Sequence, residues 1–303
     1  MRNTMNYKKI LFFCEKSKKK GGGHFIRVKR LMDVINGDYK KFFYMNLSQK
    51  RIKNLVKKND NSIIVFDFKT YKKNIFINGL KNFYVIFDNK RKYLENSVNI
   101  NPLEFKNKKF SGPKWFLYPQ NFRKKIRKKD KKNKNLFICQ GFTDAHDNLN
   151  KLVSLIIKST LTKKIKIFVK VPYKNYLNKI HLRNRNVIEI SKIQNLFNFL
   201  KKIDIAITST GNFSYELGYL QIPCIYVSDE SKEKKRGLIY QKKRLGKIFS
   251  SRDNVKIIEE FHKLCYNKFY NQGIKNNLKK YFNQNSVKNY LTLFDRISRN
   301  EKI

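Results

Sequence analysis

The chain has 303 residues, of which 69 are basic and 22 acidic, giving a formal net charge of +47. Its length and its 41% hydrophobic content are typical of a globular protein with one large domain or two ordinary ones. Such a charge points first to nucleic acid or another polyanion. However, the lysines lie in almost every segment and accompany abundant Asn, Ile, Phe and Tyr, so an AT-rich genome explains the charge as well. We therefore expect no nucleic-acid partner and leave open a peripheral association with an anionic membrane.

The sequence predicts a cytoplasmic protein. Its first apolar run, residues 10–14, is too short for the core of a signal peptide, and no run approaches the ~18 apolar residues of a membrane helix. No two cysteines form a C-x-x-C pair, and most of them border apolar runs. We therefore expect buried free thiols at Cys14, Cys139, Cys224 and Cys265.

Short apolar runs alternate with helix-period segments along the first half of the chain, which is the pattern of parallel βαβ units. The expected strands are residues 10–14, 42–47, 63–67 and 83–88. Between the first two strands lies a helix that places Val28, Leu31, Met32 and Ile35 on one face. A second helix is expected over residues 51–58.

A basic segment separates two halves of similar organisation. Nine of the twelve residues 123–134 are Lys or Arg, which indicates a solvated linker, with a polyanion contact as the alternative. Strands are expected at residues 136–141, 165–170, 187–190, 205–209 and 224–228, and helices over 255–298. The predicted fold class is therefore α/β, with two doubly wound, Rossmann-like parallel-sheet domains at residues 1–128 and 129–303. The last helices are expected to pack back on the first domain.

A glycine-rich loop over residues 21–27 runs straight into the first helix. Glycines such as Gly22 and Gly23 allow a tight turn and close approach to a ligand, and the helix offers unpaired N–H groups. His24 would lie at this helix N-terminus, and Arg27 one turn further on. The alternative is a flexible surface turn with a solvated histidine.

Two aspartates, Asp67 and Asp88, each close an apolar strand. Ligands bind at the carboxyl ends of strands in open α/β sheets, so both are candidate site residues. A helix cap or turn role explains either residue equally well on its own.

The second half has its own glycine turn, in residues 205–217. A buried strand ends in Ser209 and Thr210, and a helix begins after Gly211 and Asn212. These hydroxyl and N–H groups are placed to hold a diphosphate at the helix N-terminus, and Glu216 to accept hydrogen bonds from ribose hydroxyls. The alternative is an ordinary capped turn with an exposed glutamate.

Motifs for other chemistries are missing from the sequence. Neither glycine turn is a G-x-G-x-x-G or a G-x-x-x-x-G-K-[ST] sequence, and there is no H-E-x-x-H, D-x-D or G-x-S-x-G. We therefore predict no cofactor and no protein-bound metal. His146 follows a strand end and is a weaker candidate than His24, whereas His181 and His262 are expected on the surface.

These stretches together resemble the nucleotide-sugar hydrolase family of pseudaminic acid biosynthesis, which removes UDP from UDP-2,4-diacetamido-2,4,6-trideoxy-altropyranose. Residues 23–27 are similar to the family's G-H-x-x-R, in which the histidine is the proposed base. Further similar stretches lie at Asp67 and at residues 87–89, 98–99, 118–123, 141–144 and 209–216. The match at residues 141–144 adds Gly141, Thr143 and Asp144 to the candidate sugar-side residues.

The chain departs from that family at several positions. Phe142 stands where the family has a glycine, Asn89 replaces an aspartate, and Lys69 replaces a tyrosine. These changes bear on the sugar that is recognised and on the hydrolytic outcome more than on the fold.

The resemblance implies a GT-B fold, in which the two domains face a central cleft, and hydrolysis of a UDP-linked amino sugar by water that His24 activates. It also implies that Arg27 and Asp88 orient the base or the sugar, without a metal. The alternatives are a GT-B glycosyltransferase that moves the sugar to an acceptor and a non-enzymatic polyanion-binding protein. The sugar and the oligomeric state are not set by the resemblance.

Overall fold

The protein is described by a computed structural model over residues 7–15, 23–35, 39–68, 81–88, 96–104, 109–119, 122, 134–141, 144, 146–159, 165–282, 285–301 and 303. The chain divides into two compact units, and each is described by itself. Unit 1 comprises Met1–Pro119 with Gln284–Ile303, and unit 2 comprises Gln120–Asn283. The boundary expected at residues 128 and 129 lies outside the described residues.

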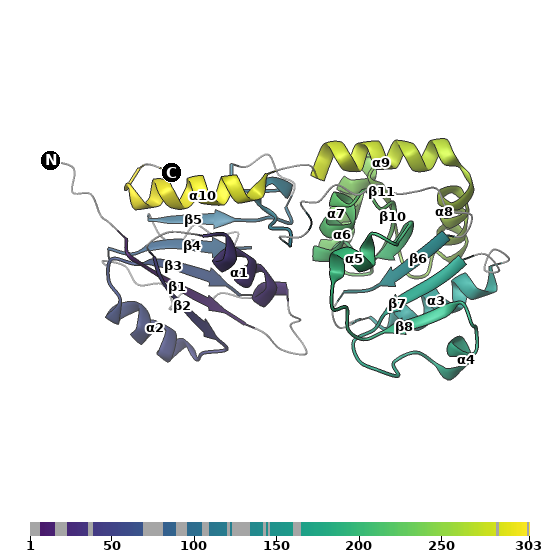
Figure 1. The fold of residues 1–303 in the computed structure, drawn as a ribbon, viewed down its shortest axis with the longest axis horizontal. Coiled ribbons are helices and arrows are strands. Elements are labelled where there is room, and N and C mark those ends of the chain that lie inside the picture. The colour runs from purple at the N-terminus through teal and green to yellow at the C-terminus, as the bar shows by residue number, and fades with distance from the viewer. Residues whose placement is uncertain are drawn as a thin grey trace. The chain divides into compact units, whose positions relative to one another are not determined.

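Unit 1 is built on a five-stranded parallel sheet (Figure 1). The strand order is β2-β1-β3-β4-β5. The strands are β1 (Lys9–Cys14), β2 (Lys40–Met45), β3 (Ile63–Asp67), β4 (Phe83–Phe87) and β5 (Ser97–Ile100). The helices are α1 (Gly23–Val34), α2 (Gln49–Lys58), the 3₁₀ turn η2 (Pro113–Trp115) and α10 (Ser286–Ser298).

Alternate residues of β1 face opposite sides of this sheet, and both sides are apolar. Ile10 and Phe12 belong to a core cluster with residues of α1 and α10, whereas Leu11 and Phe13 belong to a second cluster with residues of α2. All four side chains are buried. Helices therefore cover the sheet on both faces, which is the doubly wound arrangement that the βα alternation predicts.

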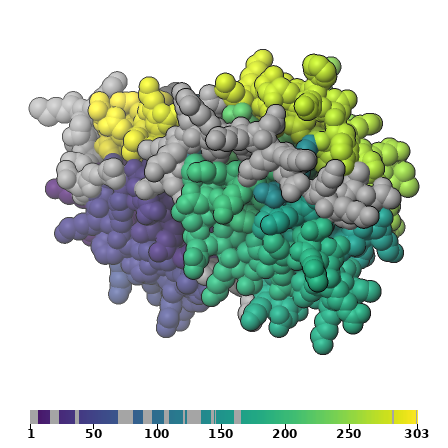
Figure 2. Space-filling view, turned by 45° about the vertical axis from the view of Figure 1, so that its right-hand side comes forward, coloured from purple at the N-terminus to yellow at the C-terminus, as the bar shows by residue number. Residues whose placement is uncertain are grey.

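Helix α10 completes the core of unit 1 from the far end of the chain. The buried Tyr290 hydroxyl donates to the carbonyl oxygen of Trp115 at 2.8 Å, and the two rings meet edge to face with centroids 5.1 Å apart. Asn289 also donates to the Lys114 carbonyl oxygen at 2.7 Å. In the space-filling view the yellow residues of α10 lie over the purple and blue surface of unit 1 (Figure 2).

Unit 2 contains a six-stranded parallel sheet in the order β11-β10-β9-β6-β7-β8. The strands are β6 (Lys134–Cys139), β7 (Ile165–Lys170), β8 (Val187–Ile190), β9 (Ile205–Thr208), β10 (Cys224–Val227) and β11 (Gly246–Phe249). The helices are α3 (Asn148–Lys158), α4 (Lys179–Leu182), α5 (Leu196–Leu200), α6 (Asn212–Tyr219), α7 (Ser231–Lys242), α8 (Asn254–Tyr266) and α9 (Lys268–Phe282). The prediction of two parallel-sheet α/β domains is thus confirmed.

Some details of the sequence-based interpretation were wrong. The four-residue strands β5 and β11 were missed, because Asn99 and Lys247 interrupt their short apolar runs. His181, expected on the surface, is buried, and its Nε2 lies 3.2 Å from the Ser154 hydroxyl. Burial lowers the pKa of this imidazole. The four cysteines are buried and free, as expected.

None of the helices in the described part of the chain is both long and apolar enough to cross a membrane.

Two glycines in helices of unit 2 have opposite surroundings, and this difference predicts opposite effects of adding a methyl group. A Cβ at Gly218 in α6 would lie 2.5 Å from the ring of the fully buried Phe282, whereas a Cβ at Gly273 in α9 would meet nothing within 4 Å. We expect Gly218→Ala to lower the free energy of unfolding by about 1–3 kcal/mol through overpacking. Gly273→Ala should raise it by about 0.5–1 kcal/mol, because alanine loses less backbone entropy. Urea denaturation of both variants measures the difference, and a Gly218→Ala protein as stable as wild type would contradict the packing.

Candidate functional site

The sheet of unit 1 changes winding direction between β1 and β3, which are neighbours in space but not in sequence. Ligands of open α/β sheets bind outside the carboxyl ends of the strands at such a switch point. Cys14, the last residue of β1, pairs with Asp67, the last residue of β3. Helix α1 begins at Gly23, so His24 lies in its first turn at the same edge of the sheet.

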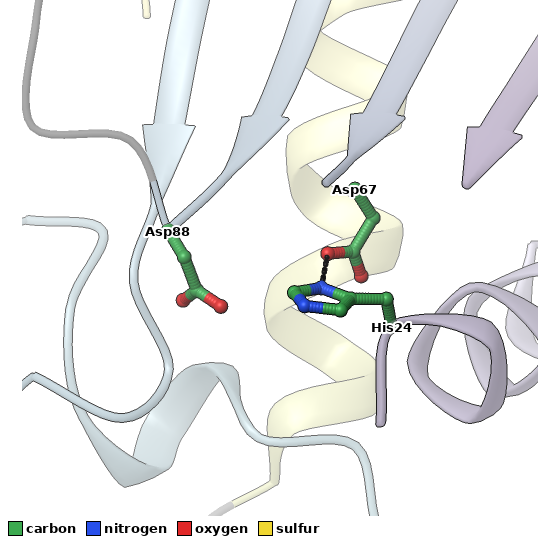
Figure 3. A group of neighbouring side chains, drawn as sticks. All are labelled: His24, Asp67 and Asp88. Atoms are coloured by element: carbon green, nitrogen blue, oxygen red, sulfur yellow. Dashed lines mark hydrogen bonds and ion pairs between the residues drawn. The ribbon is translucent and has the colours of Figure 1, made fainter. Parts of the chain in front are cut away.

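Four polar side chains meet at this point, and Figure 3 shows three of them. His24 Nδ1 lies 2.6 Å from Asp67 Oδ1. Arg27 donates to Asp67 twice, from Nε to Oδ2 at 2.7 Å and from Nη2 to Oδ1 at 2.6 Å. The same Nη2 donates to Asp88 Oδ2 at 2.6 Å. The three-residue spacing of His24 and Arg27 places both on one face of α1, so one helix turn supplies half of the cluster.

Charge pairing within the cluster outweighs the cost of burial. Burial alone would raise the pKa of the Asp67 carboxyl, but its pKa is lowered because the Arg27 charge, the Arg27 hydrogen bonds and the His24 hydrogen bond stabilise the carboxylate. Burial would likewise lower the pKa of the Arg27 guanidinium, but the charges of Asp67 and Asp88 raise it. Arg27 also lies over the Phe87 ring, 4.8 Å from its centroid. Asp67 is therefore held as a carboxylate and Arg27 as a charged guanidinium.

An ionised Asp67 decides which nitrogen of His24 carries the proton. A carboxylate only accepts hydrogen bonds, so the close Nδ1 must donate, and the neutral ring then carries its lone pair on Nε2. This nitrogen lies on the side of the ring away from Asp67 (Figure 3). The side chain of His24 is 16% exposed. The arrangement is a carboxylate-oriented histidine whose second nitrogen, Nε2, has no hydrogen-bond partner in the described part of the chain, the pairing that serves general-base catalysis.

The same residues have donor atoms close enough to hold a metal ion. Atoms of His24, Asp67 and Asp88 lie within 4.8 Å of one another. However, the Arg27 guanidinium already donates to both oxygens of Asp67 and to one of Asp88. A cation would have to displace this positive group, so the geometry favours the arginine as the charge partner.

Asp88 follows β4 with a positive φ of 55°, a left-handed conformation that aspartate tolerates better than most residues. The turn directs the chain out of the strand just where the carboxylate meets Arg27. Asp88 is 31% exposed, unlike the fully buried Asp67. Asp88 is thus the carboxylate of the cluster that water and a ligand reach most easily.

The switch point of unit 2 lies between β6 and β9, the adjacent strands at which its winding direction changes. The predicted nucleotide turn follows β9. Gly211 is the N-cap residue of α6, and among the described residues no side chain caps this helix end, where the Ser214 N–H donates to the Gly211 carbonyl oxygen at 3.1 Å. Asn212 is the first residue of α6, and its buried Oδ1 has no partner among the described residues.

The two hydroxyl residues of this turn are held by helix α7. Ser209 Oγ donates to Glu233 Oε1 at 3.3 Å, and Thr210 Oγ1 donates to the Glu233 backbone carbonyl oxygen at 2.8 Å. The Arg236 guanidinium donates to the Thr210 carbonyl oxygen. Glu233 and Arg236 were not among the predicted site residues, because nothing in their local pattern distinguishes them from other charged residues of an exposed helix.

The other predicted residues of unit 2 lie around the end of β6. Gly141 has a positive φ of 80° that favours glycine. The carboxylate of Asp144 accepts hydrogen bonds from the N–H groups of Asn148 and Leu149, each at 3.0 Å, and from the Tyr176 hydroxyl at 2.8 Å. Asp144 therefore caps α3 in this structure.

Glu216 is buried in α6 at 4% exposure, so the alternative of an exposed glutamate is wrong. Burial is the main cause that raises the pKa of Cys139 to about 12, and the negative charges of Glu216 and Asp144 add to it. The charges of Glu216 and Asp144 are therefore both felt at Cys139, the last residue of β6. Gly22, Lys69, Asn89, Phe142 and Thr143 lie outside the described residues.

The fold is similar to those of several solved structures. The chain is similar to the crystal structure of Acinetobacter baumannii MurG, with a TM-score of 0.67, 10% identity, and coverage of 95% of this chain and 99% of that one. It is also similar to an S. aureus MnaA–UDP co-structure, with a TM-score of 0.65, 9% identity and 96% of each chain covered. The Streptomyces nogalater glycosyltransferase SnogD gives a TM-score of 0.62 at 9% identity, over 96% of this chain and 99% of that one.

These likenesses identify the fold as that of GT-B glycosyltransferases and UDP-N-acetylglucosamine 2-epimerases, and the GT-B prediction is confirmed. At such low identity they define the fold alone. No family model and no curated protein sequence matches the chain.

The buried cluster of unit 1 predicts a pH-dependent loss of stability in Asp67→Asn. At about pH 7 we expect the free energy of unfolding to fall by about 3 kcal/mol, because Arg27 loses its bidentate counter-ion inside the protein. The folded-state pKa of Asp67 lies below its unfolded value, so its contribution is complete above the unfolded pKa of about 3.9 and is lost as the pH falls through the folded pKa. The difference between wild type and variant should therefore shrink below about pH 4. Urea denaturation at several pH values measures it.

The control is Asp33→Asn, which removes an exposed carboxylate from the same helix α1 and should change stability by less than about 0.5 kcal/mol at any of these pH values. A loss in Asp67→Asn that is equally small would contradict the ion-pair network.

Proposed function

We propose that the protein is a nucleotide-sugar enzyme that hydrolyses a UDP-linked amino sugar to the free sugar and UDP, in cell-surface glycan biosynthesis of the nonulosonic acid type. The observation that carries this proposal is the hydrogen bond between His24 Nδ1 and the ionised Asp67, which leaves Nε2 as a base at a switch point of the sheet. The GT-B fold and the resemblance at the G-H-x-x-R stretch supply the substrate class.

In the proposed reaction, His24 Nε2 takes a proton from a water molecule as the water oxygen attacks the anomeric carbon. A new carbon–oxygen bond forms, the bond from the anomeric carbon to the diphosphate oxygen breaks, and the electron pair leaves with UDP. Asp67 holds the ring in the reactive tautomer and stabilises the imidazolium that forms. Arg27 keeps Asp67 ionised, and the partly exposed Asp88 is the carboxylate available to a sugar hydroxyl.

Unit 2 would bind the leaving nucleotide. The uncapped N–H groups at the start of α6 and the positive end of the helix dipole suit the diphosphate. Stabilising the diphosphate as its negative charge develops would lower the barrier without a metal ion. Ribose recognition by the buried Glu216 stays a prediction.

The second candidate is a GT-B glycosyltransferase that moves the sugar to an acceptor hydroxyl. The glycosyltransferases among the similar structures favour it. The same base would deprotonate the acceptor in place of water, so the two functions differ only in the nucleophile.

Removing the base should lower turnover without removing nucleotide binding. General-base catalysis contributes about 10²–10⁴-fold, so we expect His24→Ala to reduce kcat on a UDP-sugar at least ~10²-fold while the Kd for UDP stays within about twofold. Asp33→Asn changes an exposed residue in the last turn of the same helix α1 and serves as the control, with full activity expected. Near-normal turnover of His24→Ala would remove His24 from the mechanism.

Incubation with UDP-sugars in the absence of an acceptor should separate the two candidates. We expect free UDP and free sugar to appear together in equal amounts. Chromatography and NMR measure both products over time. Slow release that accelerates when a hydroxyl acceptor is added would favour the transferase, and a UDP-sugar with an inverted centre and no free UDP would contradict both.

A further inference from the structure

Helix α7 places a carboxylate beside the start of helix α6, and neither of the two candidate functions gives this carboxylate a role. Glu233 lies in the first turn of α7, yet its Oε1 is 3.6 Å from the position that a Cβ on Gly211 would take. Gly211 is the N-cap residue of α6. The negative group therefore lies beside the helix end that is proposed to receive the diphosphate.

The surroundings of this carboxylate are those of a bound anion. Ser209 Oγ donates to one of its oxygens at 3.3 Å, and Ser228 Oγ donates to the other at 2.7 Å. Ser209 follows β9 and Ser228 follows β10, so the ends of two adjacent strands direct hydroxyl donors at one point. A positive helix end and two hydroxyl donors are also what a phosphate group requires.

The side chain of Glu233 can leave while its backbone stays in place. The Glu233 carbonyl oxygen accepts from Thr210 Oγ1 at 2.8 Å, and Arg236 one turn later donates to the Thr210 carbonyl oxygen. These contacts fix α7 against the turn without using the carboxylate. Glu233 is only partly buried, so its side chain can rotate towards solvent.

We propose that the Glu233 carboxylate is an internal substitute for the phosphate: in the free protein it accepts hydrogen bonds from the Ser209 and Ser228 hydroxyls beside the start of α6, and it is displaced when the diphosphate binds. This inference rests on the proposed nucleotide site of unit 2. Displacement frees the hydroxyls of Ser209 and Ser228 for the phosphate oxygens. It also sets a cost for diphosphate binding, because two like charges compete for one position.

The test is the affinity of Glu233→Gln for UDP, uridine and inorganic pyrophosphate, measured by isothermal titration calorimetry on the full chain. Glutamine keeps the size and an acceptor oxygen but removes the competing charge. We expect about tenfold tighter binding of UDP and of pyrophosphate, and no change for uridine, which lacks the diphosphate.

Two further variants control the measurement. Glu230→Gln removes a charge from the exposed N-cap residue of the same helix and should change UDP affinity less than about twofold. Glu233→Asp keeps the charge on a shorter side chain that withdraws it from Gly211, and should give an intermediate affinity. Thermal unfolding of each free variant shows whether it is folded, and Glu233→Asp carries the test if Glu233→Gln is not.

Each outcome decides between the two proposals. Weaker or equal UDP binding by a folded Glu233→Gln protein would overturn the displacement and make Glu233 a permanent support of the turn. Tighter pyrophosphate binding without any UDP binding would support the anion position and overturn the uridine nucleotide as substrate. If neither wild type nor variant binds UDP or pyrophosphate, both proposals fail.

Discussion

The buried contact between Arg27 and Asp67 is the interaction on which the candidate active site depends. Two parallel hydrogen bonds join a guanidinium from α1 to a carboxylate at the end of β3, at a point where the sheet excludes water. Either group alone would be costly to bury as an ion. Together they hold charges that a third residue, His24, uses: the carboxylate fixes the tautomer of the imidazole, and the guanidinium keeps that carboxylate ionised. The ion pair that organises the candidate site thus also contributes to the stability of unit 1.

The two units apply one topological principle with different chemistry. In each sheet the winding direction changes at a pair of adjacent strands, and the polar residues gather beyond their carboxyl ends. Unit 1 places a histidine and two carboxylates there, a set that suits proton transfer. Unit 2 places an uncapped helix end and hydroxyl groups there, a set that suits an anion. This division suits a reaction in which a base deprotonates the nucleophile and a negatively charged group leaves the substrate.

In the proposed nucleotide site, the Glu233 carboxylate accepts hydrogen bonds from the hydroxyl donors that a phosphate group would use. The hydroxyl donors that face this carboxylate are satisfied in the free chain, which avoids leaving polar groups without partners. Under the proposed function, a nucleotide would have to replace these hydrogen bonds. This competition favours ligands whose charged oxygens accept hydrogen bonds strongly over uncharged ligands. The charge of the chain, at +47, does not by itself provide such selectivity.

The sequence by itself determined the βα alternation, the placement of His24 in the first turn of α1 and the strand-end positions of Asp67 and Asp88, because each of these follows from hydrophobic period and short spacings. Although the sequence already predicted that the last helices return to the first domain, the order of the strands, the short strands β5 and β11, and the contacts by which α10 packs on unit 1 required the tertiary structure. So did the contact of Glu233 with Ser209, 24 residues away in the chain. A local pattern of residues indicates which face of a helix or strand is apolar. Which other helix or strand packs against that face depends on segments that are distant in sequence, so it appears only in the tertiary structure.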